Sequence, residues 1–535
     1  MLIFRKNLRI DSNFCYCCIQ LRSSSFQRFY CSKAKHKQKS SNKWNAVVGL
    51  EVHAQILSNS KLFSGAGTAF GNAANSCVSL FDCAMPGTLP VLNRRCVEAG
   101  VLTALALSCR VNETSLFERK HYFYADLPAG YQITQQRQPL AVDGEISFNV
   151  FTPGVHKEPY PKSSKLKQLQ LEQDSGKSLH DDSARMSLID LNRAGIPLME
   201  LVFEPDLSDG EEAAALVKEL VLILEKLNTC SCKMDEGALR VDANVSINKP
   251  NEPLGVRTEL KNIGSVRGVA SAVNYEISRQ IKIRENGDQI VNETRAWDVE
   301  TGRTVAMREK EDKFDYRFMP EPNLPPLLVH IDIGTTNVHN LVDATTLKSQ
   351  IPKLPQAIRD ELLEQYGVSR ALVLVLVNEP KLLSLFRHII EKNSKLSPQF
   401  VAKILCYQFM EFIHKNDLNI DFGLSISDHL EEAIDLLQSE KMNLLVFHKV
   451  LKEIQDNPEK FPTEIIEKEN WTQITDEEEL KKICQSVLDE YPDLVKKYRG
   501  GKKTLLKYFM KKIVEKTDQR ANMKHAQKLI EKMLE

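Results

Sequence analysis

Ionisable side chains alternate with apolar ones in the segment 47–57. Glu51, His53 and Gln55 are spaced two residues apart, and the positions between them are apolar. Because successive side chains of a β-strand point to opposite faces of the sheet, this spacing predicts a strand with one apolar face and one ionisable face. Carboxylate and imidazole groups are ligands for divalent cations, so the ionisable face has the chemistry to hold a metal ion.

Three further segments, 169–174, 240–247 and 257–262, show the same alternation. Their predicted polar faces add acidic, basic and amide groups. Mg²⁺ binds a few carboxylates and keeps waters or phosphate oxygens as its other ligands, and Arg and Lys bind phosphate groups. The pattern favours a metal–phosphate site on one face of a sheet; the alternative is a sheet whose polar face is simply solvated. The side chains on these faces are Gln170, Glu172 and Asp174; Arg240, Asp242, Asn244 and Ser246; and Arg257, Glu259 and Lys261.

The familiar nucleotide-binding loops are absent from the sequence. Gly176-Lys177-Ser178 resembles the end of a P-loop, but Leu171 stands where the first glycine of that loop is required. The glycines of the segment 65–71 have one residue too many for a dinucleotide-binding turn. Any ATP site in this chain is therefore expected to be built on the sheet.

The pattern of strands and helices around these residues indicates an α+β fold. From 44 to about 335, short strand-like runs alternate with Gly, Pro and Asn turns, and helical spacing appears at 96–107, 211–227 and 271–284. Strands and helices do not alternate steadily, so we expect a mainly antiparallel sheet with flanking helices rather than a Rossmann fold. The proline-rich segment 320–326 predicts the exit from this first domain, and the sequence beyond about 345 is almost wholly helical in pattern.

The net charge of zero conceals three segments of different charge. Residues 1–43 hold ten Lys and Arg against one acid, residues 496–528 hold twelve against two, and the body between them carries about −18. An Arg- and Ser-rich segment that nearly lacks acids is typical of mitochondrial transit peptides. We therefore predict that residues 1–43 are a transit peptide and that the protein works in the mitochondrial matrix; the alternative is a disordered basic arm that stays attached.

The sequence predicts neither a membrane span nor a structural metal held by cysteines. The longest apolar run, 371–377, is far shorter than the roughly 18 residues that a spanning helix needs. Four of the twelve cysteines fall in the predicted transit peptide, and the others form no pair of C-x-x-C motifs. Cys230 and Cys232 are the only close pair in the body, and we expect free thiols in a reducing matrix.

Eight short motifs follow one another along the chain. They are Val48–His53, Arg119–Tyr124, Gly130–Ile133, Asp190–Arg193, Glu204–Asp206, Leu239–Ser246, Glu259–Asn262 and Tyr316–Pro322. In this unbroken order they resemble the B subunit of glutamyl-tRNA(Gln) amidotransferase, the GatB/GatE family. The similarity runs from about residue 46 to the C-terminus, and its specificity comes from the series rather than from any one motif.

The resemblance implies a glutamine-synthetase-like antiparallel-sheet cradle over 44–335, a helical connector over 336–385 and a YqeY-like helical tail over 386–535 that binds tRNA. It implies a complex with the amidase (A) subunit and the small (C) subunit of the amidotransferase. The implied reaction phosphorylates, with ATP and Mg²⁺, the side-chain carboxylate of Glu-tRNA(Gln). Ammonia that the amidase releases from glutamine then displaces the phosphate and gives Gln-tRNA(Gln).

Site residues are carried over from the family position by position. The resemblance implies that Glu51, His53 and Glu172 bind magnesium. Lys120 and Tyr122 match positions near the reacting centre; for each residue the alternative is a structural ion pair. The expected catalytic residues are Glu51, His53, Lys120, Tyr122, Glu172, Glu200 and Asp242, and the expected ATP-binding residues are Arg240, Asn244, Glu259 and Lys261.

Two departures from the family pattern affect these expectations. Gln173 stands where many bacterial members have a second glutamate; either it is a neutral ligand, or it points into the sheet core with Leu169 and Leu171, whose parity it shares. Zinc-bearing members have four cysteines at positions that here are not cysteine, so we expect no zinc. Those positions hold Ser64, Ala66, Ser79 and Asp82, with Cys83 one residue out of register.

Two other functions remain open from the sequence. A non-catalytic tRNA-binding scaffold would have kept the cradle only as a fold, but such a decayed cradle should have lost Glu51, His53 or Asp242, and all three are present. Alternatively, the same enzyme could act on Asp-tRNA(Asn), which members of the family can also amidate. The sequence of this chain alone does not separate that substrate from Glu-tRNA(Gln).

Overall fold

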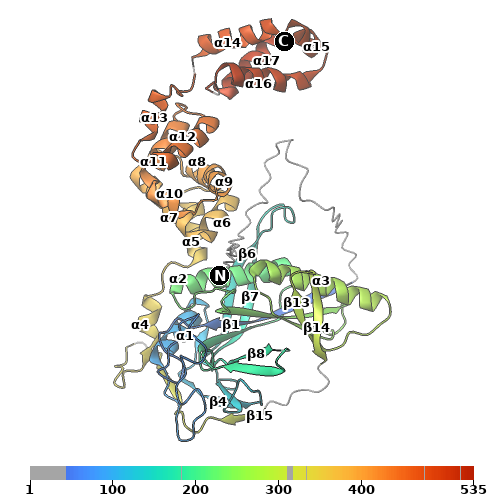
Figure 1. Cartoon of the computed structure of the whole chain (residues 1–535), viewed down its shortest axis with the longest axis vertical. Helices are drawn as coiled ribbons and strands as arrows, with labels where there is room; N and C mark the ends of the chain where they lie inside the picture. Colours follow the sequence, from blue (N-terminus) through green and yellow to red (C-terminus); the bar gives the residue numbers. More distant parts are fainter. Residues whose placement is uncertain are drawn as a thin grey trace, which may run out of the picture. The chain divides into compact units, whose positions relative to one another are not determined.

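The computed structural model describes residues 44–181, 183–309, 317–332, 334–474, 476–518 and 520–534 (Figure 1). The predicted transit peptide 1–43, with its four cysteines, and Tyr316 of the last motif lie outside the described residues. The chain divides into two compact units, one that ends at Gln356 and one that covers Ala357–Glu535. Each unit is considered by itself.

A nine-stranded sheet forms the centre of the first unit, in the order β14-β13-β12-β11-β1-β10-β7-β6-β2. Neighbouring strands are antiparallel throughout, except for the parallel pair β12–β13. The predicted α+β class with a mainly antiparallel sheet is therefore confirmed. The strands are β1 (Asn45–Gln55), β2 (Arg110–Val111), β6 (Ala141–Val150), β7 (Tyr160–Gln173), β10 (Pro197–Phe203), β11 (Leu239–Asn248), β12 (Thr258–Lys261), β13 (Glu293–Asp298) and β14 (Arg303–Glu309).

The predicted alternation of apolar and polar side chains is confirmed in the burial of β1, β11 and β12, whereas at 169–174, at the end of β7, the side chains of both faces are buried. Leu50, Val52 and Ala54 of β1 are fully buried, whereas Glu51 and His53 between them are only partly buried. Strands β11 and β12 show the same alternation in their burial. Because helices pack against the apolar face of the sheet, only the opposite, ionisable face can contact other elements or a ligand.

Three helices cover the apolar face of the sheet: α1 (Arg94–Ala106), α2 (Gly210–Leu227) and α3 (Val266–Glu285). They correspond to the three helices that the sequence predicts. Helix α3 begins earlier than the predicted residue 271, because Ser265 caps it by accepting a hydrogen bond from Gly268 N–H. Gly268 weakens the helical signal in the first turn, so the periodicity alone places the start too late.

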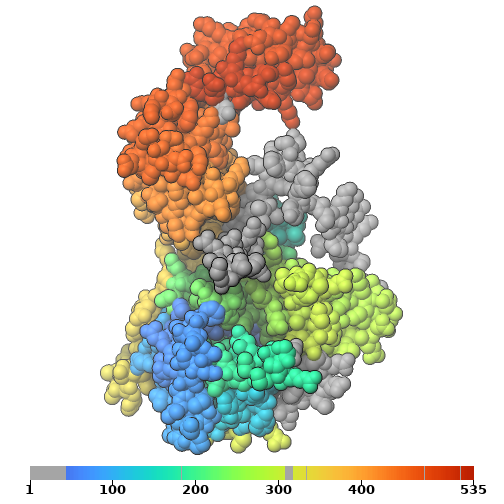
Figure 2. Space-filling view, viewed as in Figure 1, coloured from blue at the N-terminus to red at the C-terminus, as the bar shows by residue number. Residues whose placement is uncertain are grey.

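Three smaller sheets complete the first unit, in the orders β15-β4-β5, β17-β16-β3 and β8-β9. Strand β5 packs against β7, and the β8–β9 hairpin is the connection between β7 and β10. Figure 2 shows the hairpin, in green, at the surface of this unit. The strands are β3 (Thr114–Ser115), β4 (Glu118–His121), β5 (Tyr131–Thr134), β8 (Lys177–Asp181), β9 (Met186–Asp190), β15 (Arg317–Pro320), β16 (Leu327–His330) and β17 (Val342–Asp343).

The first unit extends beyond the predicted boundary at residue 335. After the proline-rich segment, β16 pairs with β3, with Leu327 opposite Ser115. Val342 and Ala344, the latter in α4 (Ala344–Ser349), belong to the apolar core of the first unit. The prolines therefore interrupt local structure without ending the unit, because the chain returns to a strand more than two hundred residues earlier in sequence.

The described part of the second unit is helical and has two apolar cores. Helices α5 to α13 surround one core and α14 to α17 the other. The predicted boundary at residue 385 falls inside α7, whose Leu385 and Phe386 share the core of α5 to α13. None of the described helices is long and apolar enough to span a bilayer.

The bounds of the helices in the second unit follow chain order. The first group is α5 (Pro355–Glu364), α6 (Arg370–Asn378), α7 (Pro380–Lys392), α8 (Pro398–Lys403), the π-helix η1 (Ile404–Phe409), α9 (Met410–Lys415), α10 (Asp421–Ser425), α11 (Ser427–Gln438), α12 (Leu444–Asp456) and α13 (Pro462–Lys468). The second group is α14 (Glu477–Glu490), α15 (Pro492–Arg499), the 3-10 helix η2 (Lys503–Leu505), α16 (Leu506–Lys516) and α17 (Met523–Leu534).

Candidate metal and phosphate site

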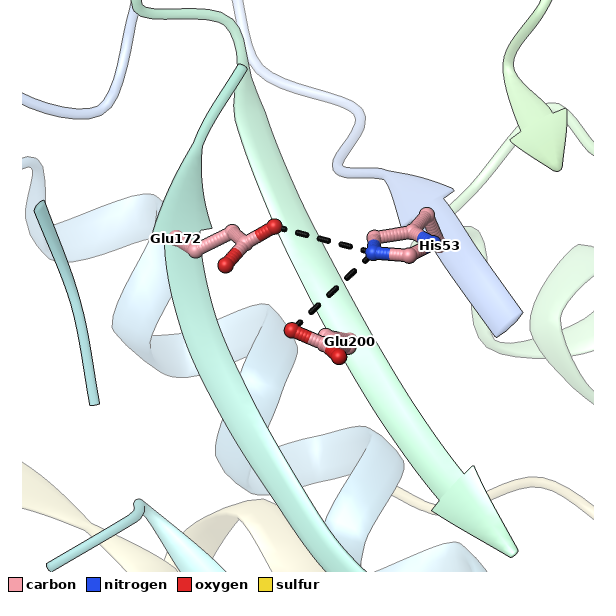
Figure 3. A group of neighbouring side chains, drawn as sticks. All are labelled: His53, Glu172 and Glu200. Atoms are coloured by element: carbon pink, nitrogen blue, oxygen red, sulfur yellow. Dashed lines mark ion pairs between the residues drawn. The ribbon is translucent and has the colours of Figure 1, made fainter. Parts of the chain in front are cut away.

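Three side chains from three adjacent strands converge on the polar face of the large sheet. His53 comes from β1, Glu172 from β7 and Glu200 from β10. His53 Nε2 lies 3.6 Å from Glu172 Oε1 and 3.9 Å from Glu200 Oε2 (Figure 3). One ligand atom from each of the three residues lies within 4.8 Å of the other two. This spacing suits three ligands of one metal ion.

Hydrogen bonds from neighbouring polar groups fix the two carboxylates. Thr134 Oγ1, from β5, donates to Glu172 Oε2 at 3.0 Å, and Gln170 Nε2 donates to Glu200 Oε2 at 2.6 Å. Glu172 Oε1 remains directed at His53. Since groups that orient the metal ligands in this way commonly tune metal affinity, Thr134 and Gln170 are part of the site.

The two carboxylates repel one another in a largely buried place. Burial is the main cause that raises the pKa of Glu200 well above its ordinary value, and the negative charge of Glu172 adds to it. The ammonium group of Lys120, on β4, acts in the opposite direction. Two carboxylate oxygens and one imidazole nitrogen fit a divalent cation, whose charge would relieve this repulsion.

Glu51, an expected magnesium ligand, does not belong to this group of three. It lies about 7 Å before His53 along β1, and its register partner on β11 is Asp242. Its Oε1 accepts a hydrogen bond from Asn244 Nδ2 at 3.0 Å. Glu200, expected as a catalytic residue only, is the third member of the group because it pairs with His53 across β1 and β10. Glu51 still contributes negative charge to the surroundings of Glu200.

A second polar group lies on β11 and β12. Lys261 Nζ is 2.5 Å from Asp242 Oδ2 and 3.3 Å from Glu259 Oε1. Burial alone would lower the pKa of Lys261, but the two carboxylates outweigh it and raise that pKa. Thr294 Oγ1 donates to Glu259 Oε2 at 2.9 Å. The structure thus brings together three of the residues that the family resemblance assigns to catalysis or ATP binding.

Arg240 and Lys120 border the group of His53, Glu172 and Glu200, and Tyr122 contacts a residue of β5. Arg240 is the register partner of His53 on β11, and its Nη2 donates to Asp174 Oδ2 at 2.8 Å. Lys120 is close enough to Glu200 for its charge to influence that carboxyl group. The Tyr122 hydroxyl donates to the side-chain oxygen of Gln132 at 3.4 Å.

Gln173 lies outside the group of three ligands and lines a cavity of about 450 Å³. Asp174 and the loop residues 81–82 and 84–89 form other parts of the cavity wall. The Gln173 side chain is therefore neither packed solely among the core leucines nor placed with the carboxylates of Glu172 and Glu200.

Asp82, one of the four positions compared with the cysteines of zinc-bearing members, forms a buried ion pair with Lys61. Lys61 is fully buried, and its Nζ lies 3.0 Å from Asp82 Oδ2 and 3.3 Å from the carbonyl oxygen of Leu191. Ser64 Oγ and the backbone N–H of Ser79 also donate to Asp82, at 3.0 and 2.8 Å. An ammonium group therefore supplies the positive charge at this place. The eight described cysteines are free thiols, as expected.

No pattern in the sequence points to several of the supporting residues. Thr134 lies in a four-residue strand, and Lys61 precedes a long irregular loop, so neither has a periodic pattern around it. Asp174 shares the parity of Glu172. Its role as the partner of Arg240, however, depends on a contact between the end of β7 and β11, which are far apart in sequence. Only the fold reveals such contacts.

Comparison with known proteins identifies the family. The profile of the GatB/GatE catalytic domain matches residues 46–334, and that of the GatB domain matches residues 384–534. The mitochondrial glutamyl-tRNA(Gln) amidotransferase B subunit of Aedes aegypti is 52% identical over 511 residues, which cover 95% of this chain and 97% of that protein. The human protein of the same name is 45% identical over 505 residues, 94% and 90% of the two chains.

A bacterial relative carries a broader name. The aspartyl/glutamyl-tRNA(Asn/Gln) amidotransferase B subunit of Rickettsia bellii is 38% identical over 485 residues, which cover 91% of this chain and 96% of that protein. Both domains and nearly the full length of the relatives are matched. The chain therefore belongs to the GatB/GatE family, the B subunits of tRNA-dependent amidotransferases, as its eight motifs indicated.

Proposed function

We propose that this chain is the kinase and transamidase subunit that converts Glu-tRNA(Gln) to Gln-tRNA(Gln) in mitochondrial protein synthesis. The observation that supports this proposal most strongly is the convergence of His53, Glu172 and Glu200 on one sheet face. The animal relatives are named as mitochondrial glutamyl-tRNA(Gln) amidotransferase subunits, and the basic segment 1–43 fits a mitochondrial address.

The chemistry begins with a carboxylate that is a poor electrophile. Transfer of the ATP γ-phosphoryl group to the glutamyl side chain creates a phosphate leaving group. Ammonia then forms the new C–N bond while the C–O bond to phosphate breaks and phosphate departs. A magnesium ion held by His53, Glu172 and Glu200 would neutralise charge on the phosphate oxygens during this transfer.

Other side chains on the same face of the sheet would bind phosphate or hold the acidic groups in place. Arg240 can donate to phosphate oxygens, because guanidinium groups match the geometry of phosphate. The amide of Asn244 holds Glu51, and Lys261 holds Asp242 and Glu259, so these acids keep fixed places on the same face. Lys120, which already influences Glu200, provides a positive charge near the reacting groups.

Two partner proteins complete the proposed reaction. The amidase (A) subunit would release ammonia from glutamine, and the small (C) subunit would belong to the same complex. The names of the relatives, which call each of them the B subunit of an amidotransferase, support a complex of several subunits. We therefore include the amidase subunit in the proposal as the source of ammonia.

The helices α14 to α17 provide a basic surface for tRNA. Lys496, Lys497, Lys502 and Lys507 are exposed and form no ion pair with other described residues. The main body of the chain is acidic, so it would repel a polyanion unless a concentrated basic region attracts and orients it. We propose that this end of the chain binds the tRNA while the sheet carries out the chemistry.

A second substrate, Asp-tRNA(Asn), is a specific alternative because the Rickettsia relatives are named for both substrates. The complex reconstituted with the amidase and small subunits should be offered Glu-tRNA(Gln) and Asp-tRNA(Asn) side by side, with ATP, magnesium and glutamine. We expect formation of Gln-tRNA(Gln). Preferential formation of Asn-tRNA(Asn) would instead support the alternative, and the absence of both products would favour a non-catalytic scaffold.

A further inference from the structure

Asp174 connects three parts of the first unit. It directly follows β7, two residues after Glu172, and is only 4% exposed. Its Oδ2 accepts a hydrogen bond from Arg240 Nη2 at 2.8 Å and lies 3.7 Å from Arg193 Nε. Its backbone N–H donates to Ile196 O, and its backbone oxygen accepts from Gly195 N–H, both at 2.9 Å. The carboxylate is therefore held firmly in place.

Arg240 retains donors that Asp174 does not use. A guanidinium group carries five N–H donors in one plane, and only one of its terminal nitrogens is bonded to Asp174. Arg240 Nε is buried without a hydrogen-bond partner among the described residues. The side chain is 35% exposed and projects from the face that carries its register partner His53. These donors are available to an anion beside the metal ligands.

The balance of charge favours Arg240 over Lys261 as the group that binds phosphate. Asp174 is shared by two guanidinium groups, so a net positive charge remains there. Lys261 instead lies between two carboxylates, so a net negative charge remains around it. An incoming phosphate is attracted to the first place and repelled from the second.

Arg193 links the same carboxylate to the β8–β9 hairpin. Its Nε donates to the carbonyl oxygen of Ser175 at 3.0 Å, and its Nη2 donates to that of Gly176 at 2.6 Å. These bonds close the base of the hairpin, where the chain leaves β7. Arg193, Asp174 and Arg240 thus form one continuous contact from the hairpin to the strand next to His53.

We propose that Asp174 is a positioning residue that holds the Arg240 guanidinium in the orientation that binds a phosphate group of the nucleotide. Asp174 does not touch the nucleotide itself; it acts through Arg240 and is braced by Arg193. This inference deepens the proposed function and rests on it, because it assigns the orientation of one phosphate-binding group to a carboxylate outside the expected site residues.

A double-mutant cycle in the reconstituted complex tests this role. The variants are Asp174→Ala, Arg240→Ala and the double variant, and the quantities are KM for ATP and kcat for phosphorylation of Glu-tRNA(Gln). We expect each single substitution to raise KM for ATP about tenfold and to change kcat less, with the double variant no worse than Arg240→Ala. Asp174→Asn, which keeps an acceptor oxygen, should recover part of the loss.

The control is Asp206→Ala, which removes another carboxylate with structural hydrogen bonds, to Ser164 and to Lys165 N–H. It should lower the melting temperature without changing KM for ATP. Multiplicative effects of the Asp174 and Arg240 substitutions would overturn the proposal, as would an Asp174→Ala variant with lower stability but unchanged KM. Both results presuppose that the wild-type complex phosphorylates Glu-tRNA(Gln); if it does not, the proposed function itself fails.

Discussion

His53 and Glu200 face one another across the antiparallel pair β1–β10, with His53 Nε2 3.9 Å from Glu200 Oε2. This relationship places an acidic side chain from β10 beside the imidazole. Glu172 on the next strand completes the group of three. Burial and the repulsion between the two carboxylates make the ionised form of Glu200 unfavourable.

Replacing Glu200 by Gln should stabilise the metal-free protein near neutral pH. Burial and the charge of Glu172 raise the pKa of Glu200, so its ionisation is unfavourable in the folded state. Such a carboxyl group lowers stability progressively as the pH rises from its unfolded pKa, about 4.3, through its raised folded pKa. The advantage of Glu200→Gln should therefore grow over this range. Thermal melts in a chelator at several pH values measure it, and a variant less stable than wild type throughout would contradict the repulsion.

Breaking the ion pair between Lys61 and Asp82 should cost about 3–5 kcal/mol of unfolding free energy, because either residue alone would be a buried unpaired charge. The substitution Lys61→Met tests this in a urea titration. Removing both charges, in Lys61→Met/Asp82→Leu, should restore part of the stability, although Ser64 and Ser79 then lose their acceptor. A loss below about 1 kcal/mol for Lys61→Met would show that water reaches the pair.

The substitution Gln173→Glu should destabilise the fold without tightening magnesium. Gln173 lines a cavity whose wall already contains Asp82 and Asp174, so a new carboxylate there would be buried among other acids. We expect a cost of about 1–3 kcal/mol. A magnesium titration beside a thermal melt separates the outcomes, and a lower magnesium requirement with unchanged stability would show that residue 173 reaches the metal.

Neutralising four exposed lysines of the second unit should weaken tRNA binding and reduce its salt dependence. We choose Lys496, Lys497, Lys502 and Lys507, each changed to Gln, rather than a truncation from residue 496. Helices α16 and α17 share an apolar core with α14, so removing them would expose it. At about 0.7–0.9 per phosphate contact, the slope of log affinity against log salt should change by roughly 3.

Lys512 and Lys516 provide the matched control for the tail. Each contacts a carboxylate, Glu515 and Glu490 respectively, so their charges are already largely compensated. The variant Lys512→Gln/Lys516→Gln should change the slope less per lysine removed. An unchanged slope in the four-lysine variant would show that tRNA is held elsewhere.

Period-two alternation predicts which side chains of one strand share a sheet face, and it correctly placed Glu51 with His53 and Asp242 with Asn244. Alternation contains no information about which strands are neighbours or how they are aligned. The position of Glu200 beside His53 and Glu172 therefore became evident only from the pairing of His53 with Glu200.

The lack of information about strand pairing also explains why the predicted boundary at residue 335 differs from the end of the first unit at Gln356. The proline-rich segment is a strong local signal, but the pairing of Leu327 with Ser115 joins residues far apart in sequence. The helices were predicted more accurately because their periodicity and capping residues are local, as in α2, which begins after the cap Asp209 and ends at the predicted Leu227.

The most direct test of the central claim compares γ-phosphoryl transfer to Glu-tRNA(Gln) by the reconstituted complex with His53→Ala and with His339→Ala. His339 is exposed and lies outside the site, so its substitution controls for the loss of a histidine. We predict that His53→Ala lowers the rate at least about a hundredfold, the scale of losing a positioned electrostatic or metal-binding group. We also predict that His339→Ala leaves the rate unchanged. Near-normal phosphorylation by the His53→Ala complex would contradict the assignment of His53, Glu172 and Glu200 as the metal site.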